Sequence, residues 1–228
     1  MTEPANLVSV EGAEEAPTTP EYDLASPELY LNRELTWLSF NRRVLHEAED
    51  ERNPLLERLR FLAISDNNLD EFVMKRIGGL KQQLAAGVHQ TTVDGRTPAE
   101  QIAACSAEIR VFRRQQGEVY AKLTKELGEH QIRFMKYQEL SSTQRAFLRE
   151  RYIEDIFPIV TPLAMDPAHP FPFISNLAIN LLITMRFPGD KELQKARVKV
   201  PAVSGVAARW LRVETDDPHA HLFLSLIH

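Results

Sequence analysis

The residues best suited to chemistry are four consecutive polar side chains, Ser65-Asp66-Asn67-Asn68, within an otherwise amphipathic segment. An asparagine amide presents a donor beside an acceptor, which suits a purine edge or a ribose hydroxyl. Phosphate groups could be held by nearby basic residues, namely Arg58, Arg60, Lys75 and Arg76. The alternative is a helix corner whose side chains cap backbone amides, with the basic residues forming a solvated face. Asp70 and Glu71 disfavour a phosphate at the helix start itself, because they already occupy its electropositive first turn.

The flanking pattern predicts that helices position these four residues. Apolar residues recur at helical spacing before them, at Leu55, Leu59 and Leu62, and after them, at Leu69, Val73, Ile77, Leu80 and Leu84. Asn68 precedes Glu71 by three positions, the spacing of a capping box. The sequence therefore predicts two helical pieces over residues 54–84, with a break at Ser65–Asn68.

Two further helices are predicted around this segment. Residues 30–52 are predicted to form a helix capped by Thr36, with an apolar stripe of Trp37, Phe40, Val44 and Ala48 that is widened by Leu38 and Leu45. Thr97-Pro98-Ala99-Glu100 is a strong helix start, and the helix that follows, about 30 residues long and roughly 45 Å at 1.5 Å per residue, ends near Gly128. A helix this long with one apolar stripe needs an antiparallel partner, and residues 54–84 supply it. Residues 28–130 are thus predicted to be an all-helical domain.

A change in pattern predicts a second domain over residues 131–228. Strands are expected at residues 131–137, 177–185, 197–201 and 209–213, and a helix starting at Ser141 is expected to bury Leu148, Tyr152 and Ile156. Five prolines exclude helix from residues 158–175. The chain stops within an apolar run, residues 222–228, which predicts a domain cut short at its C-terminus. The expected fold class is α+β: an all-helical domain of long antiparallel helices, then an incomplete α+β head domain with a mostly antiparallel sheet.

Composition narrows the class of protein. The 228 residues carry a formal net charge of -5, which argues against a general nucleic-acid binder. Cys105 is the single cysteine, so no intrachain disulfide forms, as in a reducing compartment. No apolar run is long enough for a transmembrane segment, and the start of the chain lacks the features of a secretory signal. Residues 1–27 are predicted to be a disordered acidic tail.

A complete catalytic centre is not predicted. His219 and His221 form a weak metal pattern, and His169 is expected to be a loop histidine bonded to backbone. Cys105 lies on an apolar helical stripe, where a buried, inert thiol is expected. The sequence contains neither a Walker A motif nor a G-x-G-x-x-G motif. We therefore predict no catalytic residue and no metal ligand in this chain.

Three blocks resemble the bacterial polyphosphate kinase family, in its polyphosphate kinase 1 branch. The first is residues 30–45, YLNRELTWLSFNRRVL; the second is residues 53–72, NPLLERLRFLAISDNNLDEF; the third is residues 161–177, TPLAMDPAHPFPFISNL. The blocks occur in the order expected, and the resemblance runs from about Tyr30 to the last residue.

The resemblance implies an enzyme that reversibly transfers the terminal phosphoryl group of ATP to inorganic polyphosphate through a phosphohistidine, with magnesium. This chain resembles the helical domain and much of the head domain, so the predicted site is one ATP-binding residue, Asn68. The phosphorylated histidine and the magnesium ligands are expected in absent domains, so the fragment is predicted to be inactive. The resemblance further implies ATP or ADP and polyphosphate as partners, a homo-oligomer, and a cytoplasmic location, with peripheral association with the inner membrane as the alternative. A non-catalytic helical interaction module, docking through residues 54–127, is the competing hypothesis.

Overall fold

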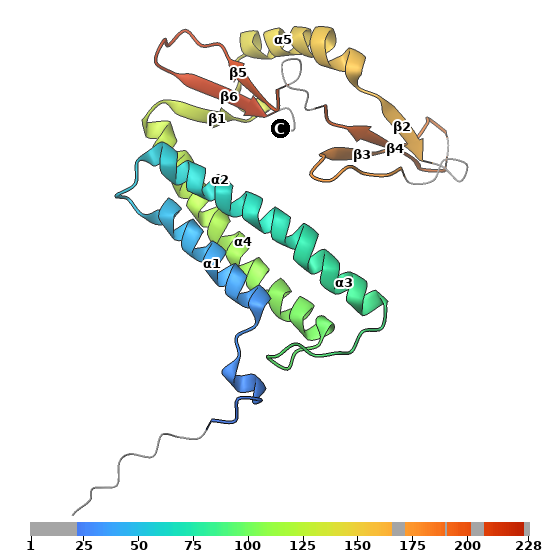
Figure 1. Cartoon of the computed structure of the whole chain (residues 1–228). Helices are drawn as coiled ribbons and strands as arrows, with labels where there is room; N and C mark the ends of the chain where they lie inside the picture. The colour runs from blue at the N-terminus through green and yellow to red at the C-terminus, as the bar shows by residue number, and fades with distance from the viewer. Residues whose placement is uncertain (1–21, 166–171, 190, 202–207, 226–228) are drawn as a thin grey trace, which may run out of the picture. The chain divides into compact units, whose positions relative to one another are not determined.

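The computed structural model describes residues 22–165, 172–189, 191–201 and 208–225 (Figure 1). The chain divides into two compact units, one of residues 1–43 and 65–113, the other of residues 44–64 and 114–228. The three long helices α1, α2 and α4 each contribute to both units. The predicted domain boundary at residue 130 stays a prediction. Most of the predicted acidic tail, residues 1–21, lies outside the described residues.

Helix α1, Arg33–Glu49, is capped by Asn32. Asn32 Oδ1 accepts hydrogen bonds from the backbone N–H groups of Glu34, at 3.0 Å, and Leu35, at 3.1 Å. The prediction that Thr36 is the cap was wrong, because Thr36 already lies inside the helix and donates its hydroxyl to the Asn32 carbonyl at 2.8 Å. An asparagine one turn earlier thus satisfies the free amides at the helix start.

Helix α2, Leu55–Phe72, runs without interruption through Ser65–Asn68. The predicted break and the Asn68–Glu71 capping box were wrong. Polar side chains here can remain in a helix because their partners lie on other helices. The irregularity falls later, where a π-helical turn, Val73–Ile77, joins α2 to α3, Gly78–Ala85.

The π-helical turn changes which residues of this segment are buried. Leu69, Phe72, Ile77 and Leu80 are buried, whereas Val73 and Leu84 are exposed. A π-helical turn closes its hydrogen bonds over one more residue than an α-helical turn. The buried stripe accordingly advances five residues from Phe72 to Ile77, where an uninterrupted α-helix would advance three or four. The predicted stripe was right at three positions and wrong at Val73 and Leu84.

The predicted apolar stripe of α1 was right at Leu38, Leu45 and Ala48, which are buried, and wrong at Phe40, which is exposed. The polar Asn41 is also buried. Trp37 is half-buried and stacks on Phe72, with ring centroids 4.6 Å apart and an interplanar angle of 13°. Helix α4, Pro98–Glu129, begins as predicted: Glu100 N–H donates to Thr97 Oγ1 at 3.3 Å, and Thr97 N–H donates to the Glu100 carboxylate at 2.8 Å.

The antiparallel pairing of α2 with α4 is confirmed by two ion pairs, one in each unit. In the second unit Arg58 pairs with Glu126 at 2.7 Å, and in the first unit Arg113 pairs with Asp66 at 2.6 Å. Residue numbers rise along α2 as they fall along α4. Helix α4 ends one residue beyond Gly128, and the left-handed conformation that follows is taken by Gln131, with φ 63°.

Beyond α4, the described strands of the second unit form two small sheets. In the first, β1, Ile132–Met135, pairs in parallel with β6, His221–Ser225, which pairs antiparallel with β5, Trp210–Val213. In the second, β4, Gln194–Lys199, lies between β2, Pro162–Met165, and β3, Asn180–Met185, and both pairings are antiparallel. The predicted α+β character and the mostly antiparallel pairing are confirmed.

Helix α5, Ser142–Arg151, is capped by Ser141 as predicted and continues as a π-helical turn, Tyr152–Ile156, and a 3₁₀ turn, Phe157–Ile159. Buried Leu140 and Leu148 form a small core with the first sheet. Of the three residues that were predicted to be buried here, Leu148 and Ile156 are buried, whereas Tyr152 is exposed.

Strand β3 lies within the strand that was predicted over residues 177–185, and its apolar residues Leu181, Leu182 and Ile183 are all exposed. The buried residues of this sheet lie on β4, at Ala196, Arg197 and Val198.

Candidate functional site

The four polar residues Ser65–Asn68 point in several directions because they follow one another along a regular helix. Ser65 is fully buried, Asp66 and Asn68 are half-buried, and Asn67 is exposed. They therefore do not form one polar loop, and each has its own set of contacts.

Asn68 is held by a second asparagine, Asn41 on α1. Asn68 Nδ2 donates to Asn41 Oδ1 at 3.1 Å, and Asn41 Nδ2 donates to the Ser65 carbonyl at 2.9 Å. Asn41 is fully buried, so this chain of hydrogen bonds fixes the plane of the Asn68 amide from inside the helices. Among the described residues, Asn68 Oδ1 and the second N–H of Asn68 have no protein partner. They are a donor and an acceptor on a half-exposed side chain.

Sequence reasoning missed Asn41. The signal was present, since Asn41 lies between the apolar residues Leu38 and Leu45 at helical spacing. A polar residue on a buried stripe needs a buried hydrogen-bond partner. The sequence alone gives no means of choosing that partner.

The basic residues near Asn68 are all matched by carboxylates. Lys75 pairs with Glu71, Arg60 lies 3.7 Å from Glu57, and Arg76 lies 3.9 Å from Glu34. Arg113 on α4 bridges two acids of α2, Asp66 at 2.6 Å and Asp70 at 3.3 Å. Such exposed pairs contribute little to stability, but they neutralise the field that would attract a phosphate.

Arg58, another basic residue considered for phosphate binding, has a structural role. It is 4% exposed, donates from Nε to the Ala48 carbonyl at 3.0 Å, and pairs with Glu126 through Nη1 at 2.7 Å. Its guanidinium therefore joins three helices. The surroundings of Asn68 consequently suit an uncharged ligand edge better than a phosphate.

The other candidate residues do not form a catalytic centre in the described part of the chain. Cys105 is fully buried, and burial raises its thiol pKa to about 11, so the prediction of a buried thiol is confirmed. His221 Nδ1 lies 3.3 Å from an Arg212 guanidinium nitrogen. His169 lies outside the described residues, as does part of the third block of resemblance.

Among the described residues, no group of three or more His, Cys, Asp or Glu is placed to hold a metal ion. These residues do not fit the magnesium ion that the resemblance implies, and no magnesium ligand is assigned to them. None of the helices described has the length and apolar character needed to cross a membrane.

Comparison with known proteins identifies two regions of the chain. Residues 30–135 match the family model for the polyphosphate kinase N-terminal domain, and residues 143–227 match the model for the polyphosphate kinase middle domain. A polyphosphate kinase of Synechocystis sp. is 50% identical over 186 residues, which are 81% of this chain and 26% of that protein. One from Prosthecochloris aestuarii is 42% identical over 197 residues, 86% of this chain and 27% of that protein.

A solved structure has the same fold. The crystal structure of polyphosphate kinase from Porphyromonas gingivalis matches with a TM-score of 0.72 and 24% identity, over 86% of this chain and 28% of that one. The chain thus spans about a quarter of the length of the relatives that it matches.

Proposed function

Because this chain belongs to the polyphosphate kinase family, we propose that it supplies part of the ATP pocket of such an enzyme through Asn68. The activity of the whole enzyme would be the reversible transfer of the terminal phosphoryl group of ATP to polyphosphate through a phosphohistidine. The role of this chain would be to recognise the nucleotide and to position it.

The observation that carries this proposal is the orientation of the Asn68 amide. Asn41 holds one N–H of Asn68, which leaves Oδ1 and the second N–H for a ligand. An adenine edge offers an amino donor beside a ring-nitrogen acceptor, which matches this pair. The carboxylate partners of the nearby basic residues support recognition of the base or ribose over recognition of the phosphates.

The chain by itself is proposed to lack transfer activity. Phosphoryl transfer depends on positioning and charge stabilisation by several groups that must be present together. Incubation of the 228-residue chain with radiolabelled ATP and polyphosphate should leave the polyphosphate unlabelled. Detection of a phosphohistidine on the chain would contradict this part of the proposal.

The test of the ATP role is Asn68→Ala in the intact enzyme that carries this segment, with ATP affinity and thermal unfolding measured separately. Loss of one amide contact should weaken ATP binding about tenfold, equivalent to about 1.4 kcal/mol. The matched control is Asn67→Ala, which removes the exposed neighbouring amide. It should leave ATP affinity unchanged.

A stability loss on the order of 1 kcal/mol in Asn68→Ala, with ATP affinity unchanged, would assign Asn68 a purely structural role. That result would favour the alternative function, a helical interaction module. The observation that supports this alternative is a set of exposed large apolar side chains on the helices, which includes Phe40, Ile64, Val73 and Met74. The homo-oligomer and the cytoplasmic location stay predictions.

A further inference from the structure

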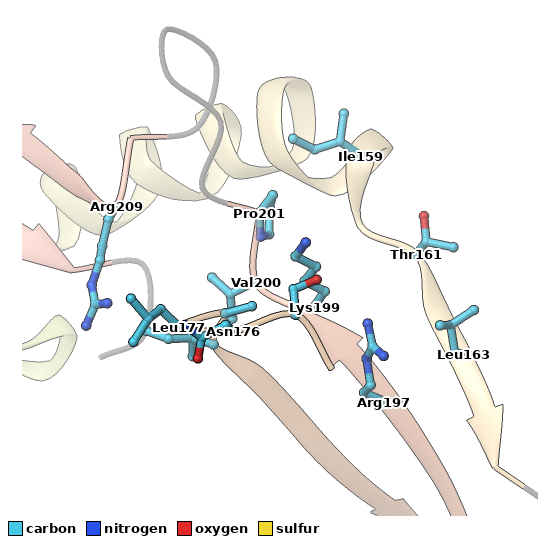
Figure 2. Close-up of a pocket in the computed structure, with 13 residues that line it drawn as sticks. Ile159, Thr161, Leu163, Asn176, Leu177, Arg197, Lys199, Val200, Pro201 and Arg209 are labelled. Carbon is cyan, nitrogen blue, oxygen red and sulfur yellow. The ribbon is translucent and has the colours of Figure 1, made fainter. Parts of the chain in front are cut away.

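A hollow of about 540 Å³ in the second unit is lined by three basic side chains (Figure 2). Arg197 and Lys199 come from β4, and Arg209 lies just before β5. The other described lining residues are apolar or uncharged, and they include the hydroxyl side chains of Thr161 and Ser175. No Asp or Glu occurs among these lining residues.

Arg197 is the most informative of the three. Its side chain is nearly buried, with 9% of the residue exposed. Nη1 donates to the Phe173 carbonyl at 2.8 Å, whereas the buried Nε has no hydrogen-bond partner among the described residues. Among the described residues, none of the carboxylates forms an ion pair with Arg197. A buried guanidinium without an anion carries a desolvation cost that a bound anion would offset.

The geometry of β4 explains why Lys199 accompanies Arg197. Side chains alternate across a strand, so positions 197 and 199 share one face, while the buried Val198 lies on the other. Figure 2 shows both basic side chains extending from β4 toward the segment that contains Ile159, Thr161 and Leu163. Lys199 is exposed, so its ammonium group remains accessible to an ion entering from solvent.

A strained turn borders the same hollow. Leu177 has φ 56°, a left-handed conformation that is uncommon for a residue with a side chain, and Ala178 N–H donates to the Ser175 carbonyl at 3.2 Å. Strained backbone is concentrated at binding sites, because the surrounding structure must hold it in place. The turn places Ser175 and Leu177 at the rim of the hollow.

We propose that this hollow binds a phosphate oxyanion at Arg197 and Lys199, the two basic lining residues of β4. A guanidinium and an ammonium group are the usual donors to phosphate. The ligand is a phosphoryl group of a linear polyphosphate chain or free inorganic phosphate. The choice of polyphosphate rests on the proposed function, whereas the oxyanion site rests on the geometry alone.

The experiment is calorimetric titration of the 228-residue chain with tripolyphosphate and, separately, with inorganic phosphate. Lys199→Gln should weaken binding about threefold to tenfold, because one charge-assisted contact is lost at an accessible position. Arg197→Lys should weaken it about tenfold or more, because the planar donor fork is lost although the charge remains. Thermal unfolding of each variant confirms that it is folded, and Lys199→Gln keeps the test valid if Arg197→Lys does not fold.

The matched control is Lys195→Gln, which removes the same charge from the same face of β4 at a position that does not line the hollow. It should leave both affinities unchanged. Unchanged binding in Lys199→Gln, or an equal loss in Lys195→Gln, would overturn the site. Tighter binding of tripolyphosphate than of phosphate supports the polyphosphate chain as ligand, and equal binding supports free phosphate.

These titrations contain no ATP, so their outcome does not depend on Asn68. Failure of the ATP proposal would show as unchanged ATP affinity in Asn68→Ala of the intact enzyme. Failure of the oxyanion site would show in the titrations of the 228-residue chain.

Discussion

Two regions of this molecule use basic residues in opposite ways. Around Asn68, the arginines and lysines considered for phosphate binding each have a carboxylate partner, and Arg58 is buried against Glu126 and a backbone carbonyl. In the hollow beside β4, the described lining holds Arg197, Lys199 and Arg209 but no acid. Basic residues are numerous in both regions, so their number does not separate them.

This difference between the two regions shows that the role of a basic side chain depends on whether it has a partner within the protein. A guanidinium whose donors are satisfied within the protein stabilises the fold, and its removal leaves a carboxylate and a carbonyl unpaired. A buried guanidinium with an unsatisfied donor is unfavourable while the site is empty. Binding of an anion would remove this cost. We therefore propose an uncharged ligand edge as the partner of Asn68 and an anion as the partner of the hollow beside β4.

The strongest test of the difference between the two regions is to replace each of the buried arginines, Arg58 and Arg197, by methionine. Arg58→Met should lower the free energy of unfolding by about 3 kcal/mol, because Glu126 and the Ala48 carbonyl lose their partner. Arg197→Met should cost about 1 kcal/mol or less, since the lost hydrogen bond to Phe173 is offset by removal of an unpaired buried charge. Urea unfolding of the 228-residue chain, followed by circular dichroism, measures both.

A control for the arginine comparison is Arg60→Met, which removes an exposed guanidinium next to Glu57. An exposed pair of this kind should change the stability by less than about 1 kcal/mol. If Arg197→Met proved as destabilising as Arg58→Met, the guanidinium of Arg197 would be a structural element and the contrast between the two regions would be lost.

A double-mutant cycle measures the coupling between Asn41 and Asn68. Asn41→Ala and Asn68→Ala should each destabilise the chain, and the double variant should lose less than the sum, with a coupling energy of about 0.5 to 1.5 kcal/mol. The coupling arises because both single variants break the same 3.1 Å hydrogen bond. Urea unfolding of the four proteins measures it, and additive losses would mean that Asn41 does not orient the Asn68 amide.

The smallest expected effect is on the pH dependence of stability, through the carboxylate of Asp94. Burial would raise the pKa of Asp94, but hydrogen bonds from Thr92, Arg96 and Asn32 outweigh it and hold the pKa below the ordinary 3.8. An acid with a lowered folded pKa stabilises the protein fully above its ordinary pKa, and this stabilisation is lost as the pH falls through the lowered value. The wild-type chain should thus lose more stability than Asp94→Asn between neutral pH and a pH below 3.8.

Urea unfolding across that pH range tests the role of Asp94. The wild-type protein should start with the higher stability and approach Asp94→Asn as the pH falls. If the free energy of unfolding changed equally with pH in the two proteins, the charge of Asp94 would contribute nothing to stability. Charge pairing would then matter less in the first unit than we expect.

The starts of two helices were predicted correctly from capping residues that are close together in the sequence. The start of α4 was predictable because Thr97, Pro98 and Glu100 satisfy the first amides of a helix by themselves. The same holds for the start of α5 at Ser141. The break at Ser65–Asn68 was predicted wrongly because polar side chains compete with a helix only when no better partner is available. Here Asn41 on α1 and Arg113 on α4 provide such partners, and neither is near in sequence.

The sequence by itself determined the helices and most strands, the buried thiol, and, through extended blocks of resemblance, Asn68 as a nucleotide-binding candidate. These features depend on periodicity, capping and residue order along the chain. Only the tertiary structure decided which polar groups were paired: Asn41 with Asn68, Arg58 with Glu126, and Arg197 without a carboxylate among the described residues. Pairing depends on distances between segments far apart in the chain, and a one-residue π-helical shift is enough to change which side chains meet.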